Sequence, residues 1–181
     1  MNDLINSKIK TKISEDLSPT RNITGFHLKI ISAIAIIWSL FQLWYASPFP
    51  FMLNIGMFKG LPARAIHLGF ALTLAFLVYP ASKGKKISFI DIIIGFIGAA
   101  SCLYIYFFYD QLVERGGVLL NLKISETLNF PLELILGGCG ILILLEATRR
   151  AIGLPLVIIA SCFLLFSYFG RYAPEIISHG G

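Results

Sequence analysis

The feature that most constrains this chain is a series of long stretches that contain no Asp, Glu, Lys or Arg. Ile30–Phe58 is the longest, and Ala65–Ser82, Ile92–Tyr109 and Ala151–Gly170 are each about as long as a bilayer crossing. A helix needs about 20 mainly apolar residues to span a hydrocarbon core of about 30 Å. With 56% hydrophobic and 14% charged residues, the chain is not expected to fold as an ordinary water-soluble domain.

These stretches are predicted to be transmembrane helices. Unpaired backbone groups are so costly in hydrocarbon that a crossing segment must be a helix or belong to a closed barrel. Barrel strands alternate apolar and polar residues, and these stretches do not. The first crossing is predicted over Leu28–Ala46, where the following Ser47 and Pro48 end it. Ala65–Ser82 and Ile92–Tyr109 are the second and third crossings.

Two further crossings have a less regular pattern. Leu134–Leu145 is short, so a fourth crossing must begin near Asn129 and include Glu133 in its first turn. Ala151–Gly170 carries Pro155 near its start, where a missing N–H costs least. The predicted fold is therefore all-α: a polytopic membrane protein with a four-helix bundle plus a fifth transmembrane or connecting helix.

The predicted organisation has three parts. Residues 1–27 form a polar cytoplasmic tail that is expected to be solvated, residues 28–150 form the four-helix membrane domain, and residues 151–181 form the connecting helix and a periplasmic tail. Of the 15 Lys and Arg residues, ten fall on one set of alternate connections and five on the other. The positive-inside rule then places the N-terminus and the turns at residues 83–86 and 149–150 in the cytoplasm, and the C-terminus outside.

The net charge of +5 is therefore a topology signal, and no nucleic-acid partner is expected. The three cysteines, Cys102, Cys139 and Cys162, lie within predicted crossings and are interpreted as packing thiols. No cluster has the spacing of metal ligands, and no nucleophile or phosphate-loop motif is present. We expect no enzyme activity, no catalytic, substrate or metal site, and no cofactor in this chain.

Ionisable residues near or inside crossings are the candidate functional residues. Glu146 lies three and four residues before Arg149 and Arg150, which indicates either a local ion pair at a helix end or docking to a partner subunit or phospholipid headgroups. Arg64 and His67 can share a helix face at the start of the second crossing, as interfacial anchors or as a partner contact. Asp91 is expected to be stabilised by the start of its helix and by nearby lysines.

Small residues form two patches that permit close approach of helices, within the chain or against another chain. One patch covers residues 95–101 on the third crossing and the other covers residues 137–140 on the fourth. The chain also lacks the inverted repeat with paired broken helices that is typical of secondary transporters. It is therefore not expected to transport a solute alone.

Several motifs resemble the membrane components of tripartite ATP-independent periplasmic (TRAP) transporters, in particular the TAXI branch. The strongest match runs from Leu144 to Pro155 and continues through Phe166–Pro174. Leu61–Phe70, with Phe76–Pro80, is similar to the beginning of the fused permeases of this family, and Tyr109, Leu112, Arg115 and Gly117 also match. The resemblance covers about residues 28–181.

The resemblance implies a small membrane subunit, or the corresponding portion of a fused permease, in the bacterial inner membrane. Its expected role is a scaffold that supports the large subunit in an elevator-type, ion-driven symport of organic acids. The partners that it implies are the large TRAP subunit, a periplasmic substrate-binding protein and phospholipids, with sodium bound in the large subunit. Two features depart from the family. Members often end this region with a small residue, His, Arg and Gly, whereas this chain ends in Ser178–Gly181 without the Arg. A fifth apolar segment also exceeds the four helices expected of the small subunit. We interpret Pro155–Gly170 as the connecting helix of a fused or split permease. The alternative is a self-associating structural or regulatory membrane protein.

Overall fold

The computed structural model describes residues 20–21, 23–58, 60–81, 87–116, 122–125 and 128–172. Five long helices make up most of this part: α2 (Phe26–Ala46), α4 (Gly60–Val78), α5 (Phe89–Phe107), α7 (Leu132–Ala151) and α8 (Leu154–Phe169). The shorter elements are α3 (Phe49–Leu53), α6 (Tyr109–Glu114), β1 (Leu122–Ser125), β2 (Leu128–Phe130) and the 3-10 turn η1 (Gly170–Tyr172). The N-terminal residues 1–19, the turn at 82–86 and the C-terminal residues 173–181 lie outside the described residues.

Three helices, α2, α4 and α5, are long and apolar enough to cross a membrane. They coincide with the first three predicted crossings, although α4 begins five residues before Ala65 and so includes Arg64. α7 is also 20 residues long, but charges at both of its ends make it more polar. α8 is apolar and has 16 residues. The fold therefore agrees with a helical membrane protein.

Two details differ from the prediction. The fourth helix begins at Leu132 and not near Asn129, because that residue belongs to β2. β1 and β2 pair as an antiparallel hairpin, with Leu122 opposite Phe130, so the described fold is helical with one small sheet and is not purely α. This hairpin was not predicted, since its strands are only four and three residues long and leave no readable alternation.

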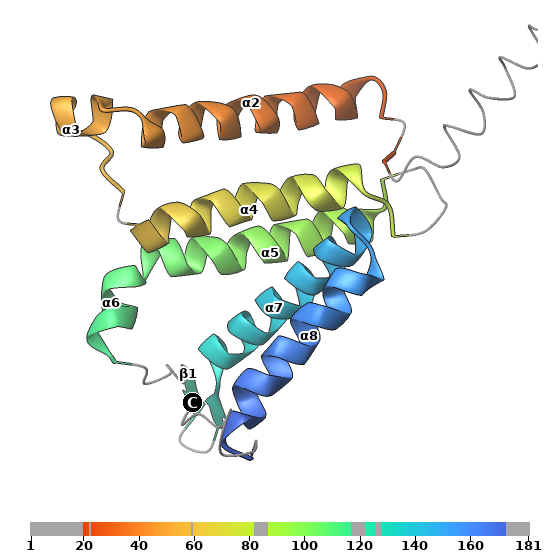
Figure 1. Cartoon of the computed structure of the whole chain (residues 1–181). Helices are drawn as coiled ribbons and strands as arrows, with labels where there is room; N and C mark the ends of the chain where they lie inside the picture. The colour runs from red at the N-terminus through yellow and green to blue at the C-terminus, as the bar shows by residue number, and fades with distance from the viewer. Residues whose placement is uncertain are drawn as a thin grey trace, which may run out of the picture.

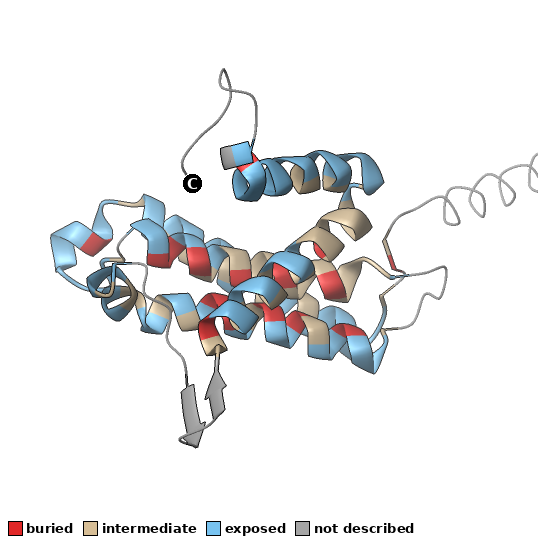
Figure 2. Cartoon of the chain, turned by 90° about the horizontal axis from the view of Figure 1, so that it is seen from below, coloured by how far each residue is buried: buried red, intermediate tan, exposed pale blue. Residues whose placement is uncertain are grey.

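The core lies where α4, α5 and α7 meet. α4 and α5 run side by side, α7 crosses them at one end, and α8 follows α7 after a short turn (Figure 1). Leu72, Phe76, Cys102 and Ala147 form the buried centre. Buried residues are concentrated on these contacting helices, whereas most of the surface elsewhere is exposed (Figure 2).

Glycines set the close approach of α4 and α5. A Cβ at Gly98 would lie 2.9 Å from Cγ2 of Ile143 and 3.2 Å from Cδ1 of Leu72, and a Cβ at Gly95 would lie 3.5 Å from Cβ of Phe76. The predicted packing role of the patch at 95–101 is therefore confirmed. In the patch at 137–140, a Cβ at Gly140 would lie 3.8 Å from Cβ of Ser101 on α5, whereas a Cβ at Gly137 or Gly138 would meet nothing within 4 Å, so only part of this patch packs within the chain.

α2 and α8 are joined to the core more loosely. α2 contacts α4 through aromatic side chains, with Trp38 and Phe41 against Phe70, but neither α2 nor α8 contains a buried residue. Gly153, with φ 115°, separates α7 from α8, and Pro155 lies in the first turn of α8 as predicted. Such apolar exposure would be unfavourable in water but is normal for a surface that faces lipid or another membrane protein.

Candidate functional site

Charged side chains gather at the end of the bundle where α4 ends, α5 begins and α7 ends. We call this group the Arg150 network; it consists of Arg21, Asp91, Glu146, Arg149 and Arg150. Its members come from two helices, α5 and α7, and from the segment that precedes α2. Ion pairs therefore join parts of the chain that are far apart in sequence.

Arg150 is at the centre of this network. Its Nη1 donates to Oδ1 of Asp91 at 2.8 Å, and its Nε donates to Oε1 of Glu146 at 2.7 Å. Its guanidinium carbon lies 4.7 Å from the ring centroid of Phe76, a fully buried residue of α4. A planar guanidinium can donate along its edge and stack on an aromatic face at the same time. Arg150 therefore ties α7 to both α4 and α5.

Arg21 holds the segment before α2 against the end of α4. Its backbone N–H donates to the Val78 carbonyl at 3.0 Å, and its Nη1 donates to the Leu77 carbonyl at 3.3 Å. Carbonyls in the last turn of a helix lack partners within the helix, and a cation there also interacts favourably with the helix dipole. Nη2 of Arg21 pairs with Asp91. Arg21 is thus buried, and the expectation that the tail is solvated is wrong at this residue.

Asp91 receives both arginines from the first turn of α5. Ser88 caps this helix by accepting from the Ile90 N–H, and the Asp91 carboxylate accepts from the Ser88 N–H, both at 3.4 Å. A carboxylate at a helix start is stabilised by the dipole, so the predicted position at the start of the helix is confirmed, while the predicted lysine neighbours at 83–86 lie outside the described residues. The pairing with Arg21 and Arg150 was not predicted.

Glu146 pairs with Arg149 and Arg150, as expected for a local ion pair at a helix end. Arg149 donates Nε to Oε2 of Glu146 at 2.7 Å and Nη2 to Oε1 at 2.8 Å. The two arginines differ in surroundings, since the Arg149 side chain is 39% exposed and that of Arg150 is 4% exposed. Only Arg149 can therefore also reach a headgroup or a partner, and docking through it stays a prediction.

A second polar group lies at the opposite end of α5 and α7. We call it the Glu133 cluster; it consists of Tyr104, Arg115 and Glu133. Glu133, in the first turn of α7, accepts at Oε1 from the Tyr104 hydroxyl at 2.9 Å and from Nη2 of Arg115 at 2.7 Å. Although desolvation lowers the pKa of Arg115, the bonds to Glu133 and Tyr104 outweigh it and raise that pKa. Arg115 therefore stays charged, and the cluster ties the turn after α6 to α7.

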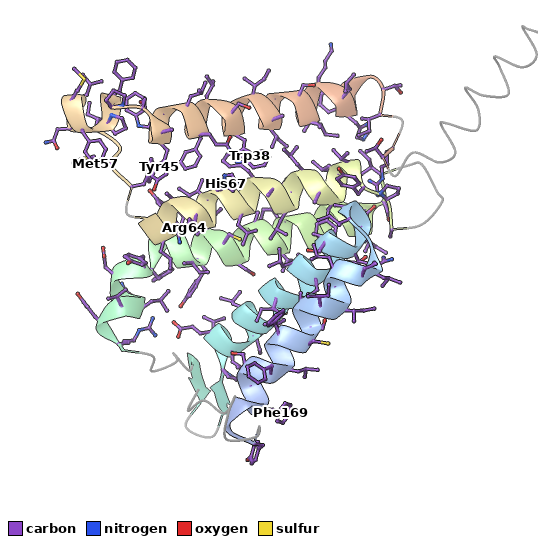
Figure 3. All side chains as sticks on the ribbon, in the orientation of Figure 1. Trp38, Tyr45, Met57, Arg64, His67 and Phe169 are labelled. Atoms are coloured by element: carbon purple, nitrogen blue, oxygen red, sulfur yellow. The ribbon has the colours of Figure 1, made fainter. Side chains whose placement is uncertain are left out.

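Arg64 and His67 lie in neither group. Both are exposed residues of α4. Nδ1 of His67 lies 3.3 Å from Nε1 of Trp38 and 3.0 Å from Nε2 of Gln42, and both of these side chains come from α2. Figure 3 shows Trp38 and His67 facing each other between the two helices, with Arg64 nearer the start of α4. The sequence did not predict the contact with α2.

The described residues contain no group of three or more His, Cys, Asp or Glu side chains that could hold a metal ion. The three cysteines are unpaired; Cys102 is buried in the core, whereas Cys162 is exposed. The packing interpretation is therefore confirmed for Cys102 and does not hold for Cys162. No family model, curated protein or solved structure matches the chain.

Sequence reasoning missed the pairing of Asp91 with both Arg21 and Arg150. One signal was present: the three residues flank apolar stretches at connections that the positive-inside rule assigns to the same side. Opposite charges at neighbouring helix ends are candidates for pairing. Many charged residues lie at these helix ends, and only the distances between their side chains in the structure show which of them pair.

Proposed function

We propose that this chain is a scaffold subunit of a multi-subunit membrane transporter and has no substrate site of its own. The observation that carries the proposal is the position of the charges. Within the described helices, Asp91, Glu133 and Glu146 are each engaged by an arginine, and they lie in the first turn of α5, the first turn of α7 and near the end of α7. Such pairs fix helix ends.

A substrate or ion pathway through a membrane protein needs polar groups near the middle of the bilayer, facing a cavity. The grooves along the described helices have mainly apolar walls. The groove between α5 and α7 has a volume of about 400 Å³ and is bordered by leucines, isoleucines and glycines, with the Glu133 cluster at one end. Side chains of this kind favour contact with another apolar surface.

The resemblance to the TRAP family supports a specific form of this proposal. In that form, the chain is the small subunit, or the small-subunit portion of a fused permease, of a TAXI-type transporter in the bacterial inner membrane. It has a cytoplasmic N-terminus and five crossings. It enlarges the static part against which the large subunit moves in an elevator-type uptake of organic acids, and it contributes to docking of the periplasmic binding protein. Ion pairs that lock the helix ends agree with a static role.

Reconstitution tests the proposal. The tagged chain is purified from its own cells in mild detergent, intact masses are measured, and the preparation is placed in liposomes with an inward sodium gradient. We expect a large hydrophobic membrane protein to co-purify, or the intact mass to show that it is part of the same polypeptide. We expect organic-acid uptake only when that component and the binding protein are present. Uptake by liposomes that contain residues 1–181 alone would refute the scaffold role.

A second candidate is a self-associating structural or regulatory protein. It is favoured by the open face of α7, where a Cβ at Gly137 or Gly138 would meet nothing within 4 Å. Small residues on an open helix face allow a second helix to approach closely. A purified homo-oligomer without any second membrane protein would support this candidate and contradict the first.

A further inference from the structure

One surface, between α2 and the first half of α4, presents hydrogen-bond donors. We call it the His67 patch; it consists of Trp38 and Gln42 on α2 and of Arg64 and His67 on α4. The hydrogen bonds within this patch determine which of its N–H groups remain free to bind a partner.

The hydrogen bond from Trp38 fixes the tautomer of His67. An indole N–H can only donate, so Nδ1 of His67 is the acceptor of the 3.3 Å contact with Nε1 of Trp38. The proton of the neutral ring therefore lies on Nε2. No described residue accepts a hydrogen bond from that nitrogen, and His67 is exposed. Nε2 of His67 is thus a donor without an acceptor among the described residues.

Arg64 adds a second donor beside the first. It is exposed and forms no hydrogen bond or ion pair with any described residue, and it precedes His67 by three positions on α4. Residues three apart are neighbours on a helix surface. A guanidinium and an N–H without acceptors form a surface that is complementary to an anion, because both groups can donate to one carboxylate.

The position of His67, the deeper of the two donors, favours a protein carboxylate over a lipid phosphate. α4 has 19 residues and is about 28 Å long, which matches a hydrocarbon core of about 30 Å. His67 lies seven residues after Gly60, and hence about 10 Å in from the start of the helix. Phosphate groups lie outside the hydrocarbon core, whereas a side chain on a neighbouring helix can be placed at this depth.

The described long helices of a second copy do not provide such a carboxylate. The acidic residues of the described long helices are Asp91, Glu133 and Glu146, and each is paired with an arginine of its own chain. All three also lie near helix ends and not 10 Å in. Within the long helices that the structure describes, a second copy therefore offers no free carboxylate, which favours a different polypeptide as the source of the acceptor.

We propose that the His67 patch binds a transmembrane helix of a second, different membrane protein through an Asp or Glu side chain, which accepts hydrogen bonds from Arg64 and from Nε2 of His67. This inference rests on the proposed function, since that function supplies a membrane partner. It adds the place of contact and the chemistry of the partner.

Site-directed crosslinking tests the inference. The photoreactive residue p-benzoylphenylalanine replaces Ala71, which lies four positions after His67 on the same face of α4 and leaves both donors intact. The matched control places it at Phe96, an exposed residue of α5. The full chain is crosslinked in native membranes, and crosslinked peptides are sequenced by mass spectrometry. We expect position 71, and not position 96, to label an apolar segment with an Asp or Glu in a second membrane protein.

Substitutions then test the chemistry. We expect Arg64→Gln and His67→Leu each to weaken the complex about tenfold or more, because one charged partner loses its donor in a dry interface. The thermal stability of the isolated chain should not change in Arg64→Gln, since this side chain has no partner there. Replacing the labelled carboxylate with Gln should cause a similar loss, and this loss should be smaller in the Arg64→Gln background than in the unmodified chain.

The outcomes separate the two proposals. Labelling of lipid alone or of a second copy from position 71 would overturn the inference, and so would a complex that is insensitive to both substitutions. A membrane partner that co-purifies but is labelled elsewhere would leave the scaffold proposal intact and refute only the His67 contact. The absence of any second membrane protein, in the sample and in the same polypeptide, would refute both.

Discussion

Replacing Arg150 with glutamine removes the central side chain of the Arg150 network, and Arg149→Gln is its matched control. The two arginines are adjacent and share Glu146 as a partner. Arg150 also pairs with Asp91 at 2.8 Å and stacks on Phe76 at 4.7 Å. The side chain of Arg150 is 4% exposed and that of Arg149 is 39% exposed. Arg149→Gln and Arg150→Gln therefore change the same residue type in the same local sequence, and the two sites differ only in burial and in the number of partners.

The expected magnitudes follow from this difference. Removing one partner of a buried ion pair costs about 3–5 kcal/mol, because the other charge is left without compensation. Asp91 retains Arg21, so we expect the lower end, about 3 kcal/mol, for Arg150→Gln. An exposed ion pair contributes about 0.2–1 kcal/mol, so Arg149→Gln should cost less than about 1 kcal/mol. A gap of about 2 kcal/mol corresponds to about 30-fold in the unfolding equilibrium.

The assay is reversible unfolding of the purified chain in mixed micelles with increasing SDS, followed by helical circular dichroism. Arg150→Lys is a third variant; it retains the charge but lacks the planar fork that reaches Asp91 and Glu146 together, so we expect an intermediate loss. Equal losses for Arg149→Gln and Arg150→Gln would show that burial of the network does not govern its strength. A loss below about 1 kcal/mol for Arg150→Gln would refute its central role.

Three further predictions concern packing, the Glu133 cluster and the N-terminal segment. Gly98→Ala should lower the free energy of unfolding by about 1–2 kcal/mol, because side chains of α4 and α7 lie 3.2 and 2.9 Å from the added Cβ; Gly137→Ala, with open space, should be neutral or slightly stabilising in the isolated chain. Tyr104→Phe removes a 2.9 Å hydrogen bond to the Glu133 carboxylate and should cost about 1.5 kcal/mol in the same unfolding assay. Trypsin should cleave after the buried Arg21 only at SDS concentrations that unfold the chain, as followed by mass spectrometry.

Each of these predictions has an outcome that contradicts it. Equal stability of the two alanine variants would show that the close approach at Gly98 is not limiting. A Tyr104→Phe variant as stable as the unmodified chain would mean that the hydroxyl gains nothing from its acceptor. Rapid trypsin cleavage after Arg21 under native conditions would show that the segment before α2 opens independently of the helices.

The number and approximate positions of the long helices could be read from the sequence, because length without charge is a local property that a bilayer selects directly. α2, α4 and α5 agree with the predicted crossings within a few residues. The break at Ser47 and the position of Pro155 in the first turn of α8 were also predictable. The Glu146 pair with Arg149 and Arg150 was predictable for the same reason, since residues three and four apart must meet on one helix.

The contacts between distant segments required the tertiary structure. Arg21 and Asp91 are 70 positions apart, and Asp91 and Arg150 are 59 apart; no periodicity relates such residues. The register of the hairpin and the contact of His67 with α2 likewise depend on how neighbouring segments are placed. The sequence alone determined which segments can enter a membrane, because that depends on each segment's own transfer free energy. Only the tertiary structure decided which charges are neutralised within the chain and which donors remain for a partner, because electrostatic pairing depends on distance in space.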